Sequence, residues 1–352
     1  MIEKIKFRVP GKVIVNGSYI VLSGETCRAV ALKTHMTSEA TRTVSSEAEI
    51  TVAVDGGEKI TYGSDYIRTC RDTGGPAHYI LNIVACFFEI ARISPKNRIH
   101  IEMHTGEGFF SGGPGGEKTG IGSSACILVS IVYALLRFHQ DDFRRIASRG
   151  DFDARGRSPV FQGDLKLWLG GLSLSEDLAE HLLSITYLVH QATNQGASGC
   201  DVMCCLLGSI YFSRERCFPL ENIPRYLILG SFGKSSATRE MLKKINSKDP
   251  KWRFIKDINR KINEERESPK KLYMEYLDAM KGVSTAIVPE KQYEVLMKTN
   301  GYDIWGCGIS GAGGDDCVWA LADDYQDVYR YWKRVFTFTF VTEVSYRGIH
   351  LL

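Results

Sequence analysis

Alternating apolar and polar positions along the first hundred residues are typical of β-strands. The pattern predicts two strands, Ile5–Val9 and Lys12–Leu22, which Pro10-Gly11 separates. The segment from Ala29 to Val54 continues in the same way, with many β-branched residues. Arg98–Thr105 alternates again, and we expect a further strand there. The first third of the chain is therefore predicted to be mainly a sheet.

Helical periodicity and strand-like runs are mixed in the rest of the chain. Helices are expected at Ala77–Ile93, Ser123–Leu136, Asp141–Gly150, Leu178–Asn194, Val202–Leu207 and within Ala237–Val288, and strands at Ser209–Glu215, Tyr226–Gly233 and FTFTFVTEV. The segment from Phe152 to Gly171, which glycine and proline interrupt, is expected to be strand or loop. Because the two kinds of element do not alternate strictly, the pattern favours an α+β fold.

Length and composition narrow the class of protein. A chain of 352 residues is long for one core, so we predict two domains, 1–220 and 221–352, with the boundary near the prolines of CFPLENIPRY. The net charge is +3 and the basic residues are spread along the chain, which argues against nucleic acid or a membrane surface as the main partner. No signal-peptide core or run of membrane-spanning length is found, so a cytoplasmic protein is expected.

The ten cysteines do not indicate a metal site. They are scattered and form no C-x-x-C pair, so a structural zinc site is not expected. Most lie in apolar surroundings, where cysteine acts as a small buried hydrophobe.

The stretch EKTGIGSSACILVSIVYALL, Glu117–Leu136, is the strongest local signal for chemistry. Gly120 and Gly122 allow a tight turn and a close approach of a ligand, and Ser123 and Ser124 are favoured residues for a helix N-cap. The apolar helix that follows would direct unpaired N–H groups and its positive end at one spot, which favours phosphate. The stretch matches neither of the two familiar nucleotide-binding loops, and the run SGGPGGEKTG before it is expected to be a mobile flap.

Three glycine-bearing motifs occur in a specific order: PGKVIVNG at Pro10–Gly17, KTGIGSSA at Lys118–Ala125 and GISGAGGDD at Gly308–Asp316. With them the chain resembles the GHMP kinase superfamily over nearly its whole length. It is most similar to eukaryotic-type phosphomevalonate kinases, also through QGASGCDV, GSIYFSR and GSFGKSSATREML. It departs from them at Ala197, where a lysine and a slightly longer segment are usual. Ser18, where mevalonate kinases usually carry an acidic residue, argues against mevalonate kinase.

The resemblance implies a fold and an activity. The fold would be a two-domain α+β GHMP kinase fold, with an N-terminal domain like ribosomal protein S5 domain 2 and a ferredoxin-like C-terminal domain. The activity would be ATP-dependent, Mg²⁺-assisted phosphorylation of 5-phosphomevalonate to the diphosphate, a step toward isoprenoids and sterols. The partners would be small molecules, ATP and a phosphorylated acceptor. Two alternatives stay open: a GHMP kinase with a hydroxyl acceptor, such as mevalonate kinase or a sugar kinase, and a non-catalytic ligand-binding homologue.

The resemblance also implies roles for particular residues. Lys12 and Asp201 would be catalytic, Lys12 beside the transferred phosphoryl group and Asp201 near the acceptor oxygen, as a base or as an orienting group. ATP phosphates would lie on the loop Lys118, Thr119, Gly120, Ile121, Gly122, Ser123, Ser124 and Ala125. Acceptor contacts would come from Lys118, Ser198, Ser236, Thr238, Gly311, Ala312, Gly313 and Gly314. Either Ser123 or Ser124 would ligate magnesium. Further cations for an acceptor phosphate could be Lys234, Arg71 or Arg155, whereas His181 and His190 are expected to be ordinary helix residues.

Overall fold

The computed structural model describes residues 2–63, 75–113, 116–149, 158–172, 174–234, 241, 243, 245–246, 248–264 and 269–352. Its strands are β1 (Ile2–Asn16), β2 (Cys27–Thr43), β3 (Glu49–Val54), β4 (Ile60–Gly63), β5 (Arg98–Thr105), β6 (Val160–Phe161), β7 (Ile210–Phe212), β8 (Arg216–Pro219), β9 (Tyr226–Ser231), β10 (Gly306–Ile309), β11 (Val318–Ala322), β12 (Phe338–Ser345) and β13 (His350–Leu351). Its α-helices are α1 (Pro76–Ala91), α2 (Ser123–Phe138), α3 (Gln140–Ser148), α4 (Leu165–Leu169), α5 (Glu176–Thr193), α6 (Cys200–Leu207), α8 (Lys251–Glu264), α9 (Lys270–Val283), α10 (Glu290–Thr299) and α11 (Gln326–Trp332), with 3-10 turns at Ile20–Ser23 and Gly170–Leu172.

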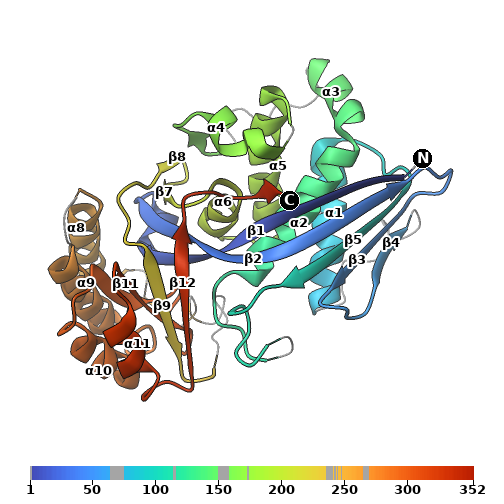
Figure 1. Cartoon of the computed structure of the whole chain (residues 1–352). Helices are drawn as coiled ribbons and strands as arrows, with labels where there is room; N and C mark the ends of the chain where they lie inside the picture. The colour runs from blue at the N-terminus through green and yellow to red at the C-terminus, as the bar shows by residue number, and fades with distance from the viewer. Residues whose placement is uncertain are drawn as a thin grey trace.

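One continuous sheet connects the two ends of the molecule. The strand order is β10-β11-β9-β12-β2-β5-β3-β4, and β1 pairs with β2 along its length. Strand β12 is hydrogen-bonded to β9 on one side and to β2 on the other, so it links strands of the C-terminal part to those of the N-terminal part. β3 and β5 are parallel and are connected through β4 and α1. The long ribbons β1 and β2 form the axis of Figure 1.

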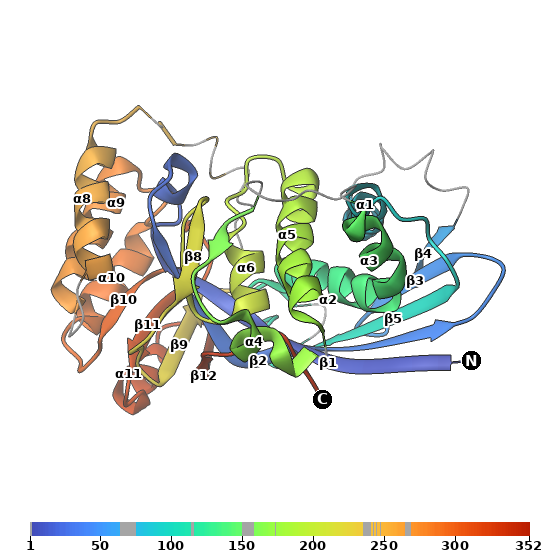
Figure 2. The same cartoon turned by 90° about the horizontal axis from the view of Figure 1, so that it is seen from above.

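Helices cover the sheet in two groups. One group, α1, α2, α5 and α6, packs over the long strands, and α2 contacts the other three helices as well as β1, β2 and β5. The second group, α8 to α11, lies with β9 to β11 at the other end of the molecule (Figures 1 and 2). Nearly every residue of α2 is buried, which explains its almost wholly apolar sequence. Among the described helices none is by itself long and apolar enough to cross a bilayer; α2 and α3, bent by 78°, reach that length only together.

The predicted break at Pro10-Gly11 is wrong. β1 continues through it, and the structure has instead a register shift against β2 between Pro10 and Lys12. β1 advances there from Pro10 to Lys12 while β2 advances from His35 to Ala31, so the extra residues are on β2 and the pairing resumes without a break in β1. The second predicted strand does end early, because β1 stops at Asn16 and Ile20–Ser23 form a 3-10 turn. The expectation of strand or loop for Phe152–Gly171 is also partly wrong, since this segment contains α4.

Candidate active site

A cavity of about 130 Å³ opens where β1, the 3-10 turn after it, the loop before α6 and the β10–β11 loop meet. Its polar lining consists of Lys12, Ser18, Tyr19, Ser198 and Asp201. Its remaining lining consists of Ile14, Leu22, Gly196, Ala197, Gly311 and Ala312. Segments far apart in the sequence therefore converge on one small space, and both predicted catalytic residues face it.

Lys12, which follows the register shift between β1 and β2, lies against the glycine loop. The Lys12 N–H donates to the carbonyl oxygen of Ile121 at 2.8 Å, which ties the strand to the segment just before α2. The whole residue is only 7% exposed, although its side chain lines the cavity. A buried ammonium group needs an anionic partner, because desolvation penalises the charged form. The partner is the carboxylate of Asp201, across the cavity.

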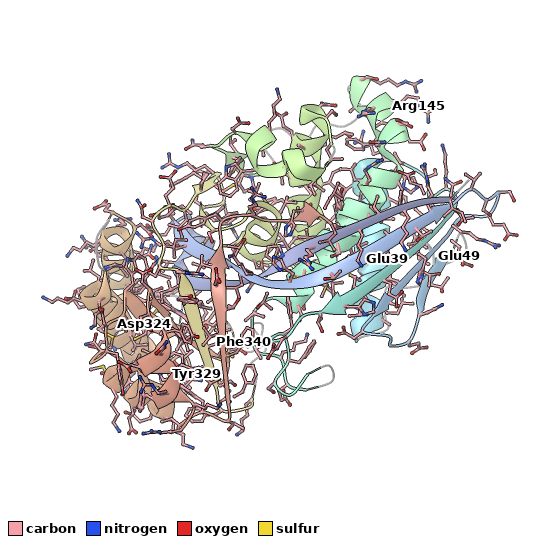
Figure 3. The ribbon with its side chains drawn as sticks, in the orientation of Figure 1. Glu39, Glu49, Arg145, Asp324, Tyr329 and Phe340 are labelled. Atoms are coloured by element: carbon pink, nitrogen blue, oxygen red, sulfur yellow. The ribbon has the colours of Figure 1, made fainter. Side chains whose placement is uncertain are left out.

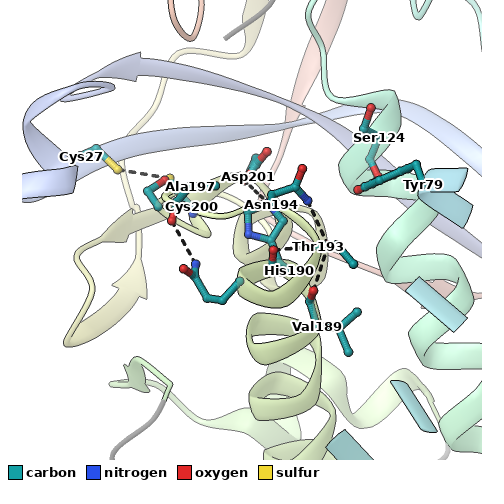
Figure 4. A network of polar contacts seen from close by, with 12 residues as sticks. Cys27, Tyr79, Ser124, Val189, His190, Thr193, Asn194, Ala197, Cys200 and Asp201 are labelled. Carbon is teal, nitrogen blue, oxygen red and sulfur yellow. Dashed lines mark hydrogen bonds and ion pairs between the residues drawn. The ribbon is translucent and has the colours of Figure 1, made fainter. Parts of the chain in front are cut away.

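Asp201 is held at the N-terminus of α6. The helix starts after Gly199, and Asp201 lies in its first turn, where the N–H groups of residues 201 and 202 help to lower the pKa of its carboxyl group. On its other side it contacts His190 of α5, with 3.5 Å between His190 Nε2 and Asp201 Oδ1 (Figure 4). About a third of the Asp201 side chain, 34%, stays exposed because it lines the cavity.

The charges of Lys12 and Asp201 stabilise each other. Burial would lower the pKa of Lys12, but the Asp201 carboxylate, together with the neighbouring thiols of α6, raises this pKa above its ordinary value. Burial would likewise raise the pKa of Asp201, but His190, Lys12 and the helix N–H groups lower it below its ordinary value. At neutral pH the cavity therefore contains an ammonium group and a carboxylate, both ionised.

The glycine loop reaches Lys12 through Gly122. Gly122 is the N-cap of α2 with φ of 93°, and a Cβ atom added there would lie 2.7 Å from Cε of Lys12. The predicted serine cap is therefore wrong: α2 begins at Ser123, and neither Ser123 nor Ser124 makes a side-chain capping bond. A glycine with positive φ brings the chain around without a side chain, so the loop and the lysine can touch.

Other residues of the loop are turned into the protein. The Thr119 hydroxyl donates to the Gly108 carbonyl oxygen at 2.5 Å and the Thr119 N–H donates to Phe109, so the expectation that Thr119 contacts phosphate is not supported. Ile121 and Ala125 are buried in the core, 1% and 3% exposed, and could contribute only backbone groups to a ligand. Lys118 and Ser124 are exposed, whereas Ser123 is buried.

The predicted flap has a hairpin-like base. Phe110 and Lys118 form an isolated antiparallel bridge, and the Ser111 N–H donates to the Glu117 carbonyl oxygen at 2.9 Å. Gly108 packs so closely on β12 that an added Cβ would lie 2.5 Å from the ring of Phe340, which is labelled in Figure 3. This base connects the start of the glycine loop to β12.

The third motif is a loop between two strands, β10 and β11. Gly311 and Ala312 line the cavity, and the Ala312 carbonyl oxygen accepts a hydrogen bond from the hydroxyl of Tyr19. The N–H groups of Gly313 and Gly314 are engaged inside the protein, with the carbonyl oxygens of Ser310 at 3.0 Å and Ile287 at 2.9 Å. The acceptor contacts expected of Gly313 and Gly314 could therefore not use these two N–H groups.

A magnesium ion would find oxygen donors at two places, the start of α2 and the start of α6. No group of three or more His, Cys, Asp or Glu side chains that could hold a metal occurs among the described residues. The available donors are the hydroxyls of Ser123 and Ser124 at the start of α2 and the Asp201 carboxylate. Mg²⁺ prefers oxygen ligands, keeps several waters and binds substrate phosphates together with one or two protein groups.

Sequence reasoning missed two residues of this site. Tyr19 closes the cavity against the β10–β11 loop, and His190 contacts Asp201. The signal for His190 was a single basic residue inside the apolar run ITYLVHQA, which more often marks an ordinary core histidine. Among the other predicted contacts Ser198 lines the cavity, whereas Lys234 is exposed and outside its lining. Ser236, Thr238, Arg71 and Arg155 lie outside the described residues.

The chain matches none of the protein-family models and none of the curated proteins with which it was compared. Solved structures do match it. The mevalonate kinase of Methanococcus jannaschii is 18% identical, with 98% of each chain covered and a TM-score of 0.67. The phosphomevalonate kinase of Streptococcus pneumoniae, solved with phosphomevalonate and AMPPNP, is 17% identical, with 96% of this chain and 99% of that chain covered and a TM-score of 0.63.

A third match extends the likeness to a sugar kinase. The galactokinase of Lactococcus lactis, solved with galactose, is 12% identical, with 99% of this chain and 95% of that chain covered and a TM-score of 0.63. These likenesses have low identity but nearly full coverage, so they concern the fold. The chain has the two-domain α+β fold of the GHMP kinases, as its sequence motifs predicted.

Proposed function

We propose that this chain is an ATP-dependent kinase of the eukaryotic phosphomevalonate kinase type, which converts 5-phosphomevalonate to 5-diphosphomevalonate. The observation that carries the proposal is the position of Lys12. Its ammonium group lines the same cavity as Asp201, while its stem lies against Gly122 of the glycine loop. A cation between a phosphate-binding loop and an acceptor pocket suits phosphoryl transfer, which needs positioning and charge stabilisation more than covalent help.

ATP is proposed to place its phosphates at the N-terminus of α2, near Gly120, Gly122, Ser123 and Ser124. The free N–H groups and the positive end of that helix favour anions. Magnesium, held by the phosphates with a serine hydroxyl, would neutralise part of their charge. Lys12 would then contact the γ-phosphoryl group as it moves toward the acceptor, and Asp201 would orient Lys12 and the acceptor.

We also propose that residues 1–220 form the ATP-binding domain and residues 221–352 the second domain. The helices α8 to α11 with β9 to β11 form a separate end of the molecule, which supports this division. The cavity takes lining from both parts, since Lys12 and Asp201 belong to the first and Gly311 to the second. The acceptor would therefore bind between the domains.

The charge of the cavity lining favours a second candidate as well. Lys12 is the only cationic side chain among the described residues that line the cavity. A phosphorylated acceptor needs a further cation, for which the exposed Lys118 beside the glycine loop is our first candidate. An unphosphorylated hydroxyl acceptor, such as mevalonate or a sugar, would not need one. We therefore retain a hydroxyl-acceptor kinase as the alternative.

An assay of ADP release with different acceptors tests the proposal directly. The purified chain, ATP and Mg²⁺ are incubated separately with 5-phosphomevalonate, mevalonate, homoserine and galactose, and ADP release is coupled to NADH oxidation. We expect turnover with 5-phosphomevalonate alone and, by ³¹P NMR, a product with a diphosphate. Turnover only with one of the other acceptors would replace the main proposal by the alternative. No turnover with any of them, together with tight ATP binding, would favour a non-catalytic homologue.

The effect of Asp201→Asn depends on the acceptor. A phosphate group has its second pKa near ~6 and is largely ionised at pH 7, so it needs no base. For 5-phosphomevalonate we expect kcat at pH 7.5 to fall by less than about tenfold, whereas losing a general base for a hydroxyl acceptor costs about 10²–10⁴-fold. Steady-state kinetics measure the ratio of the wild-type kcat to that of Asp201→Asn. The KM for ATP shows whether Lys12 has stayed in place. A loss above about 100-fold with unchanged KM for ATP, relieved at high pH where the acceptor loses its proton without a base, would contradict the orienting role.

A further inference from the structure

His190 is a buried imidazole beside the candidate site, and phosphoryl transfer as proposed above gives it no role. It belongs to the last turn of α5 and is 4% exposed. Its Nε2 atom lies 3.5 Å from Oδ1 of Asp201, and Figure 4 shows both residues where α5 meets α6. The separation is longer than a strong hydrogen bond, as is common for catalytic contacts before a ligand binds.

The surroundings of the ring determine which nitrogen carries its proton. Burial lowers the pKa of His190 below its ordinary value, against the opposing effect of Asp201, so the ring is neutral at pH 7. A neutral imidazole has one N–H group. Nδ1 has no hydrogen-bond partner among the described residues, whereas Nε2 faces a carboxylate. The proton therefore belongs on Nε2, where it can be donated to Asp201.

His190 does not line the cavity, so it cannot touch an acceptor placed there. We propose that His190 is a positioning residue, whose neutral Nε2–H group holds the Asp201 carboxylate toward Lys12. Its effect on turnover rests on the proposed kinase function, but the contact itself does not. Asp201 would be fixed from two sides, by the N-terminus of α6 and by α5. Lys12 would then face a carboxylate held in one orientation. The N-terminus of α6 alone would not fix that orientation.

Few other groups near the contact change charge between pH 3 and pH 8. The titratable groups that face it are Lys12 from β1, Cys200, Cys204 and Cys205 from α6, Cys126 from α2 and Tyr79 from α1. Burial raises the pKa of Tyr79 and of the three α6 thiols, and Asp201 raises that of Lys12. A change of pH in this range therefore acts here mainly through His190 and Asp201.

The first experiment does not depend on any activity. The free energy of unfolding is measured by urea titration from pH 3 to pH 8 for the wild type, His190→Leu, Asp201→Asn and the double variant. The lowered pKa of Asp201 contributes stability above its ordinary value of 3.8, and that stability is lost as pH falls through the folded value. In the His190→Leu background we expect this loss to occur about 0.5 to 1 pH unit higher. In the Asp201→Asn background, adding His190→Leu should cause no such shift in the pH at which stability is lost.

The second experiment measures turnover with the acceptor identified above. We expect His190→Leu to lower kcat a few-fold, no more than Asp201→Asn does, and to leave the KM for ATP unchanged. His190→Gln keeps an N–H donor near the position of Nε2 and should restore most of kcat. His181→Leu on the same helix is the matched control, because His181 contacts Phe143 and the Asp177 carbonyl oxygen instead.

The outcomes separate this proposal from the proposed function. A pH shift in the unfolding experiment without kinase turnover would support the His190–Asp201 contact and reject only the proposed function. If His190→Leu lowered stability equally at every pH, with no coupling to Asp201→Asn, the positioning role would be rejected whatever the activity. His190→Gln protects against failure of the leucine variant to fold, since it keeps an N–H donor and the Asp201-dependent loss of stability should occur at the same pH as in the wild type.

Discussion

Lys12→Met is expected to lower kcat by about 10³-fold or more while leaving the chain folded. Methionine keeps an unbranched stem against Gly122 but removes the ammonium group that would stabilise charge on the transferred phosphoryl group. Losing one such electrostatic contact in a transition state costs about 10²–10³-fold, and more for cations on phosphoryl groups. The matched control is Lys6→Met on the same strand, where the side chain is exposed and should matter little.

The stability of the Lys12→Met variant should depend on pH in a defined way. The raised pKa of Lys12 contributes stability that is complete below its ordinary value of 10.5 and is lost as pH rises through the folded value. The lowered pKa of Asp201 contributes stability above its ordinary value of 3.8, and this stability is lost as the pH falls through the folded value. The variant should therefore be less stable than the wild type from about pH 4 to pH 10 and converge with it outside that window.

The size of that difference is limited by the exposure of Asp201. Removing one partner of a fully buried pair costs about 3–5 kcal/mol, and we expect less here because Asp201 is one-third exposed. Urea titrations across the pH range, together with steady-state kinetics at pH 7.5, measure both effects. A kcat of Lys12→Met within tenfold of the wild-type value would contradict the proposed role of Lys12. An equal loss of kcat in Lys6→Met would point to a general effect of charge.

Gly122→Ala is expected to lower kcat/KM by about 100-fold, through Lys12. The added methyl group would lie 2.7 Å from Cε of Lys12 and must push the ammonium group aside. The φ of 93° also strains any residue with a side chain, at a cost of about 1–2 kcal/mol. Strain alone would lower stability but not selectively lower turnover.

The matched control for strain is Gly56→Ala, in the turn between β3 and β4. Gly56 also has a positive φ, 69°, but a Cβ atom there would meet nothing within 4 Å. Both variants should lose similar stability in a urea titration, and only Gly122→Ala should lose most of its activity. Equal activity in the two variants would show that Gly122 is needed for its backbone alone and not for room beside Lys12.

The periodicity of apolar residues correctly predicted those helices and strands whose burial follows that periodicity. The strand Arg98–Thr105 and the helix after Gly122 follow from periodicity, because each buries one apolar face or is buried all round. The apparent break at Pro10-Gly11 was misleading, since pairing with β2 on both sides of it outweighs the missing N–H donor. Thr119 was predicted to belong to a phosphate-binding loop, but its hydroxyl and N–H groups donate to the carbonyl oxygens of Gly108 and Phe109. Such partners lie about ten residues away in the chain and have no local signal.

Sequence by itself determined the fold class, the glycine loop before a buried helix, and Lys12 and Asp201 as candidate residues. These depend on residue type, short spacing and the order of motifs, all of which can be read along the chain. Tertiary structure alone decided that Lys12 touches Gly122, that Asp201 contacts His190, and that Tyr19 closes the cavity against Ala312. Each of these contacts joins segments that lie far apart in the sequence. Their geometry is set by how the helices and the loop pack on the shared sheet, which no local pattern encodes.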